Sequence, residues 1–130
     1  MRNPLPFKSG GVEVGTAWAT LKSLTVPKTA YEKMWCEVAS AATGSTLSDF
    51  RIRVKAHRDG SYVTLLDGTD FDDTSLEALL FCTDAGPHEL PVSSVAAFRA
   101  KVAGPAAMQL QAKAVGSTST VTVRGNLYNE

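Results

Sequence analysis

The amino-acid sequence predicts an all-β protein, a two-layer antiparallel β-sandwich of the jelly-roll or immunoglobulin-like kind with an extended N-terminal arm. Apolar and polar residues alternate over residues 50–66 and again over residues 98–124, which is the period of half-buried strands. Turn-forming pairs, Asp59-Gly60 and Gly116-Ser117, interrupt this alternation. Because a sheet with one apolar face must cover that face, two stacked sheets follow.

The start of the chain differs from the rest in composition. Residues 1–15 are rich in Gly and Pro, which favours an extended arm, and residues 16–130 are predicted to form one sandwich domain. Leu5, Pro6 and Phe7 form the only apolar cluster near the start of the arm. An extended segment with few side chains to bury can lie along a neighbouring subunit, so these three are candidate partner-binding residues.

Two strands are predicted next. Residues 17–26 mix apolar residues with Thr and Ser and end at Pro27, as a strand does. Residues 31–42 fit two periods. A helical stripe would contain Tyr31, Met34, Trp35 and Val38, and a strand face would contain Met34, Cys36 and Val38. We favour a strand because the surrounding pattern is β throughout.

The hairpin over residues 50–66 is the most specific structural prediction. A two-residue turn at Asp59-Gly60 pairs Ala56 with Val63 and Val54 with Leu65. The predicted buried face then contains Phe50, Ile52, Val54, Ala56, Val63 and Leu65. The opposite face contains Arg53, Lys55, His57, Tyr62 and Thr64. On this polar side Arg51, Arg53 and Lys55 are candidate contacts for an acidic neighbour, although a solvated face is the simpler interpretation.

Three further strands are predicted in the C-terminal third. The Gly116-Ser117 turn would pair Ala112 with Val121. A loop at residues 104–106 would bring Val102 opposite Met108. These pairings predict a three-stranded meander with one apolar face.

The charge balance restricts the class of partner. Lys and Arg total 13, Asp and Glu total 13, and the formal net charge is +0. Phosphate binding needs a clear positive excess, so nucleic acid is not an expected partner. No apolar stretch approaches the length of a membrane span, and the N-terminus lacks the apolar region of a secretory signal. We therefore expect no membrane partner, and synthesis in the cytoplasm.

The sequence contains no recognisable catalytic motif. His57 and His88 have no Ser, Cys or second His at a spacing typical of a catalytic triad or a metal site. The chain is therefore predicted to be non-enzymatic, with no catalytic residues, no metal and no cofactor.

Two local features leave alternatives open. The turn Asp67–Asp73 has four carboxylates in seven residues. These could ligate calcium, but their spacing does not match an EF-hand, and solvated turn residues are the simpler interpretation. Cys36 and Cys82 are expected to be buried thiols, with a disulfide between them as the alternative.

Two segments carry a family resemblance. TLSDFRIRVKAHRDGSYVTLLDGTD (residues 46–70) and FRAKVAGPAAMQLQAKAVGSTSTVTVRG (residues 98–125) resemble small β-sandwich virion proteins of tailed bacteriophages. The resemblance implies a structural role as a capsid decoration (cement) protein that binds and stabilises neighbouring capsid subunits, or as a neck or tail component. It also implies location in the virion, contact with the major capsid protein or other virion subunits, and a homo-oligomer.

A carbohydrate-binding module is the alternative, because similar strands occur in lectin-like sandwiches. The aromatic residues that would stack on a sugar are Trp18, Tyr31, Trp35 and Tyr62. Aromatic side chains are equally common in ordinary cores. Their scatter along the sequence, together with the arm, favours the virion protein.

Overall fold

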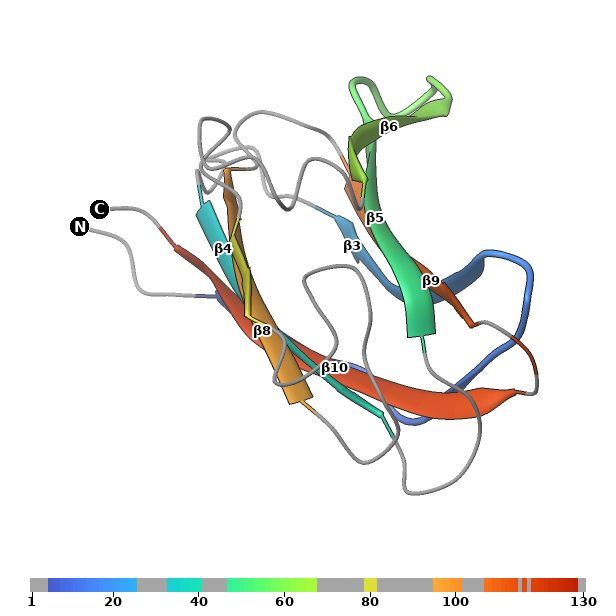
Figure 1. Cartoon of the computed structure of the whole chain (residues 1–130). Coiled ribbons are helices and arrows are strands. Elements are labelled where there is room, and N and C mark those ends of the chain that lie inside the picture. Colours follow the sequence, from blue (N-terminus) through green and yellow to red (C-terminus); the bar gives the residue numbers. More distant parts are fainter. Residues whose placement is uncertain are drawn as a thin grey trace.

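The computed structural model describes residues 5–25, 33–40, 47–67, 79–81, 95–101, 107–114, 116 and 118–128, and every regular element within these ranges is a β-strand. Sheet A runs in the spatial order β1 (Leu5–Lys8), β10 (Ser119–Tyr128), β4 (Lys33–Ser40), β8 (Val95–Lys101) and β7 (Leu79–Phe81), and β2 (Val12–Val14) also pairs with β10. Sheet B runs in the order β3 (Ala19–Thr25), β9 (Ala107–Ala114), β5 (Leu47–Lys55) and β6 (Tyr62–Asp67). All pairings are antiparallel, and the two sheets form the two layers seen in Figure 1.

The strand pairing is nested. β1 and β2 pair with β10, β3 with β9, β4 with β8, and β5 with β6. The chain thus pairs like one long hairpin that closes at the β5–β6 turn and is rolled into two sheets. This is the arrangement of a jelly roll, to which β7 is an addition. The predicted two-layer antiparallel sandwich is confirmed, and the strand order selects the jelly roll over the immunoglobulin-like arrangement.

The core lies between the two sheets, where alternate residues of each strand meet. In β4 the even-numbered positions are buried and Trp35 is exposed, so residues 33–40 form the strand that period-two alternation predicted. The largest fully buried side chains come from both sheets: Met34, Val38, Val123 and Leu127 from sheet A, and Ile52 and Met108 from sheet B. Burial of such apolar area is the main stabilising contribution in a chain of this size.

The β5–β6 hairpin is present, but its turn is longer than predicted. Val54 lies opposite Val63, whereas a two-residue turn places Leu65 there. The Gly60 N–H donates to the His57 carbonyl oxygen at 2.8 Å. The Asp-Gly pair therefore occupies the last two positions of a four-residue turn, and glycine at the final position is typical of a type I turn. Next to the turn the predicted register was wrong by two residues, a shift that leaves each side chain on its face, and beyond the register shift at Ile52 it was wrong by one.

The six apolar residues predicted to be buried in this hairpin separate into two groups. Phe50 and Ile52 are buried in the core, and Val54 is partly buried and packs against it. Ala56 is exposed, and the exposed fractions of Val63 and Leu65 are 57% and 40%, so this half of the prediction was wrong. The reason is that β6 is the edge strand of sheet B, and the β5–β6 register shifts between Ile52 and Arg53.

The predicted C-terminal meander was also wrong. β8 and β10 lie in sheet A, and β9 lies between β3 and β5 in sheet B. Ala112 faces Ala19 and Phe50, not Val121. Strands that pack across a sandwich show the same alternation as strands that pair in one sheet, so periodicity alone did not distinguish the two arrangements.

Residues 5–14, which lie in the predicted arm, run along β10 of the same chain in this structure. Leu5 faces Leu127, and Val14 faces Ser119. Between the two short strands, the Ser9 N–H donates to the Val123 carbonyl oxygen at 2.8 Å. Phe7 and Val14 belong to the buried core cluster, so this segment also stabilises its own domain.

Candidate functional site

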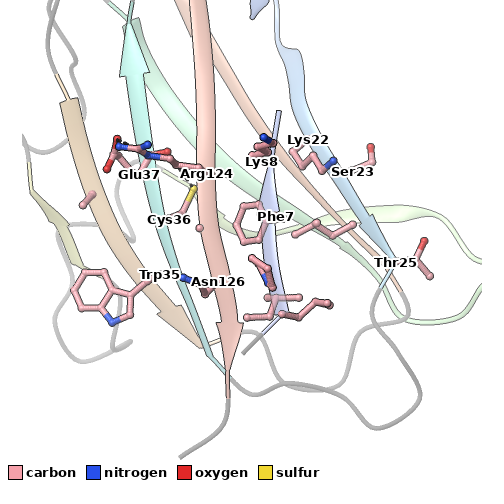
Figure 2. A pocket seen from close by; sticks show the side chains of 16 residues that line it. Phe7, Lys8, Lys22, Ser23, Thr25, Trp35, Cys36, Glu37, Arg124 and Asn126 are labelled. Atoms are coloured by element: carbon pink, nitrogen blue, oxygen red, sulfur yellow. Dashed lines mark hydrogen bonds and ion pairs between the residues drawn. The ribbon is translucent and has the colours of Figure 1, made fainter. Parts of the chain in front are cut away.

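In the described part of the chain, a groove of about 860 Å³ extends from the edge strand β1 of sheet A to the edge strand β3 of sheet B (Figure 2). The buried side chains that line it are apolar: Phe7, Leu24, Cys36 and Leu127. Polar side chains also line it: Lys8, Lys22, Ser23, Thr25, Glu37, Arg124 and Asn126. An apolar concavity of this size with a few polar groups is typical of binding sites.

Gly125 shapes the wall of this groove. It pairs with Phe7 on one side and with Cys36 on the other. A Cβ atom at this position would overlap the Trp35 carbonyl oxygen and would lie 2.8 Å from the Phe7 ring. Only glycine therefore allows β4, β10 and the Phe7 ring to approach this closely.

The free edge of β1 lacks a donor at Pro6. The Ser9 N–H points toward β10, and the direction alternates along an antiparallel strand. The N–H positions of Lys8 and Pro6 therefore point away from β10, and Pro6 has no hydrogen to donate. Proline at this position blunts an edge against strand addition, so a partner at the groove would be recognised mainly through side chains.

An ion pair and an exposed aromatic ring lie on the sheet A side of the groove (Figure 2). Arg124 Nη2 and Nε lie 3.0 and 3.1 Å from Glu37 Oε1. The Trp35 ring is exposed, and the Arg99 guanidinium lies 5.9 Å from its centroid. The side chain of Cys36 faces the core side, where burial, with a smaller contribution from Glu37, raises the pKa of its thiol. Cys36 is a free thiol.

The predicted cationic residues lie elsewhere, on the outer face of sheet B. Arg51 donates from Nε to Gln111 Oε1 at 2.7 Å, and its guanidinium lies 4.1 Å from the Trp18 ring centroid. Arg53 donates from Nη2 to the Tyr62 carbonyl oxygen at 2.9 Å. The structure therefore does not bring the predicted partner-binding residues together: Leu5, Pro6 and Phe7 line the groove, and Arg51, Arg53 and Lys55 lie on the other sheet.

The predicted aromatic platform is not assembled either. Trp18 and Tyr62 accompany cations on the outer face of sheet B, at 4.1 Å from Arg51 and 5.3 Å from Lys55 respectively. Trp35 lies on sheet A, outside the core. The simpler expectation that these rings fill the core was wrong for all three. Tyr31 lies outside the described residues.

The remaining candidates are only partly described. His57 is exposed at the hairpin turn, and its Nδ1 accepts a hydrogen bond from the Asp59 N–H at 3.1 Å. His88, Cys82 and residues 68–73 of the acidic turn lie outside the described residues. Within the described ranges, no three His, Cys, Asp or Glu side chains lie close enough together to hold a metal ion. No helix in the described part of the chain is long and apolar enough to span a membrane.

Comparison of the chain with protein-family models, curated proteins and solved structures gave no match. The fold class therefore follows from the strand order of this structure, and the groove and the outer sheet faces are its candidate functional surfaces.

Proposed function

We propose that this chain is a non-enzymatic structural protein of a tailed-phage virion, a capsid decoration (cement) protein that binds and stabilises neighbouring capsid subunits. The observation that carries the proposal is the apolar groove beside β1, because its position fits the segment for which the sequence predicts partner contacts. Leu5, Pro6 and Phe7 all line it.

The groove offers apolar area that a neighbouring subunit could cover. Leu5 is 37% exposed and Trp35 is exposed to a similar extent, although both are large apolar residues and both line the groove. Each square ångström of apolar surface removed from water contributes about 25 cal/mol. Since Pro6 blunts the free edge of β1, the partner would insert apolar side chains between β1 and β3.

Two titratable residues of the groove, Glu37 and Cys36, support a binding role over catalysis. Glu37 is engaged by Arg124 through two contacts of about 3 Å, and the Cys36 thiol has its pKa raised by burial. A nucleophilic cysteine requires the opposite, a lowered pKa.

The copy number in purified virions tests the proposed role. Mass spectrometry of particles from the source of this sequence should find the chain at an abundance close to that of the major capsid subunit. A much lower abundance, as for a protein that forms one ring in each particle, would favour the alternative, a neck or tail component. Absence from particles would contradict both.

A pair of variants tests the groove. Leu5→Glu places a charge on the apolar lining, and we expect it to reduce recruitment to capsids while the unfolding midpoint stays close to that of the wild type. Val95→Glu is the matched control, since Val95 is 45% exposed on sheet A and does not line the groove. Equal recruitment of both variants would contradict the assignment of the groove. Deletion of residues 1–11 is a less specific test, because it also removes Phe7 from the core cluster and so lowers the stability of the domain.

One observation favours carbohydrate binding as a second candidate function. The exposed Trp35 ring lies on the outer face of sheet A, opposite Asn126 and two positions from Glu37, and an aromatic ring beside carboxylate and amide groups suits a sugar. A glycan-binding screen with Trp35→Ala as the control separates the two functions. Binding that requires Trp35 would favour the sugar-binding module, whereas a capsid contact does not predict glycan binding.

A further inference from the structure

The outer face of sheet B presents cations at regular intervals along β5. Arg51, Arg53 and Lys55 occupy alternate positions of one strand, so their side chains leave the same face. Two residues of a strand span about 6.5–7 Å. We name these three residues the basic row.

Neutral groups and aromatic rings hold the basic row in place. Arg51 is fixed by Gln111 and by the Trp18 ring, Arg53 by a backbone carbonyl, and the Lys55 ammonium lies 5.3 Å from the Tyr62 ring centroid. Gln111 is itself buried and donates from Nε2 to Thr20 Oγ1 at 3.0 Å, so the Arg51 guanidinium is anchored across β5, β9 and β3. The side chains are therefore oriented before any partner arrives, which reduces the entropy lost on binding.

The cations of the basic row outnumber the carboxylates beside them, which are Asp67, directly opposite Arg51 on β6, and Asp49, two positions before Arg51 on β5. None of the three residues of the basic row forms an ion pair within the described part of the chain. Desolvation and the nearby Arg53 charge lower the pKa of Arg51, and Asp49 opposes this only in part. Lys113 adds a further cation, 4.7 Å from the same Trp18 ring centroid. Cations that repel each other at fixed positions are stabilised when an anion binds among them.

From this geometry we infer that the basic row binds an extended acidic polypeptide segment of a partner protein, with carboxylates at every second residue. Such a segment presents side chains on one face at the same interval of about 6.5–7 Å. The pairing is therefore complementary in charge and in spacing. It adds a second binding surface, on the opposite sheet from the groove, and it does not depend on the virion assignment.

A polypeptide fits this surface better than a nucleic acid. The whole chain has a formal net charge of +0, whereas binding to phosphate backbones depends on a positive excess over the protein. The basic row is also short, three residues on one strand, which suits a short segment with a few carboxylates.

Peptide titration tests the inference. The probe is a synthetic peptide of about eight residues in which Glu alternates with Thr, matched to the length of β5. A peptide of the same composition with all Glu residues first is the control for spacing. Calorimetry at low ionic strength should show tighter binding of the alternating peptide, with affinity falling as salt is added.

Variants assign the binding to the basic row. Lys55→Gln and Arg51→Gln should each weaken binding roughly two- to fivefold, the range for partly exposed ion pairs. Arg99→Gln is the matched control, because Arg99 is a cation on β8 of sheet A that does not line the groove, and it should leave the affinity unchanged. The unfolding midpoint of each variant shows whether that variant is folded. The salt dependence of peptide binding to the wild type tests the inference even if a variant does not fold.

Three outcomes would overturn the inference: equal affinity for both peptides, tighter binding of an oligothymidylate probe than of either peptide, or an equal effect of Arg99→Gln. The Leu5→Glu variant alters the groove and leaves the basic row intact. The proposed function, tested by recruitment of this variant, and the present inference, tested by peptide affinity, can therefore fail independently.

Discussion

The substitution Gly125→Ala should destabilise the protein strongly, because the added methyl group has no free volume. Its Cβ would overlap the Trp35 carbonyl oxygen and would lie 3.0 Å from the Cys36 Cα. Ordinary contacts between non-bonded carbon atoms begin near 3.5 Å. Both contacted atoms belong to the backbone of β4, so no side-chain rotation relieves the overlap, and β10 must move away from its neighbour.

The magnitude follows from the cost of overpacking. An extra methylene in a well-packed core costs about 1–3 kcal/mol. We expect at least about 3 kcal/mol here, because a backbone displacement also weakens the pairing of β10 with β1 and β4. For a chain of this length, the average unfolding entropy converts about 3 kcal/mol into a decrease in Tm of about 11 °C.

Urea and thermal unfolding measure this effect, and the m value should be the same for the variant and the wild type. Gly10→Ala is the matched control, since no atom lies within 4 Å of a Cβ placed there. It should change the free energy of unfolding by less than about 1 kcal/mol and in the stabilising direction, because alanine restricts the unfolded chain. A Gly125→Ala variant as stable as Gly10→Ala would refute the close approach described for β4, β10 and Phe7.

Three further predictions concern the burial of hairpin residues, the Cys36 thiol and the two histidines. Ile52→Ala should cost about 2–4 kcal/mol in the same assay, whereas Val63→Ala, at a position 57% exposed, should cost much less; similar losses would contradict the observed separation of the hairpin residues. Burial raises the pKa of the Cys36 thiol, so above the ordinary thiol pKa of about 8.5 the unfolded chain loses this proton first and stability falls by up to about 1.4 kcal/mol per pH unit. The difference between wild type and Cys36→Ala isolates that slope, and a pH-independent difference would show that the thiol is solvated. The double variant His57→Gln with His88→Gln should leave folding and particle binding unchanged, whereas the loss of a hydrolytic activity in that variant would contradict the proposal of a non-enzymatic protein.

Residue alternation was sufficient to predict the fold class. It placed Phe50 and Ile52 in the core, and it correctly favoured a strand for the segment containing Met34 and Cys36. Alternation reports which side of a strand is buried, and that information survives a register error of two residues. This is why the β5–β6 turn could be predicted wrongly while Val54 still packs against the core.

Strand neighbours could not be predicted in the same way. The residues after Gly116 were expected to form a hairpin with β9, but β10 instead crosses to the other sheet and pairs with β4. A short polar connection suits both arrangements. The groove was missed for a related reason, since it depends on which strands lie at the two sheet edges. The one local signal was Gly125 inside an otherwise regular strand, a pattern typical of a close backbone approach.

The nested pairing has a consequence for the order in which the molecule folds. Among the described strands that pair with each other, β5 and β6 are joined by the shortest connection, and each outer pair encloses a longer stretch of chain, up to β1 with β10. Closing longer loops costs progressively more entropy, and pairing between distant strands slows folding. β1 therefore docks last and exchanges its amide protons first. A partner that covers the groove would bind only the completed fold, and would slow the opening of β1 by mass action.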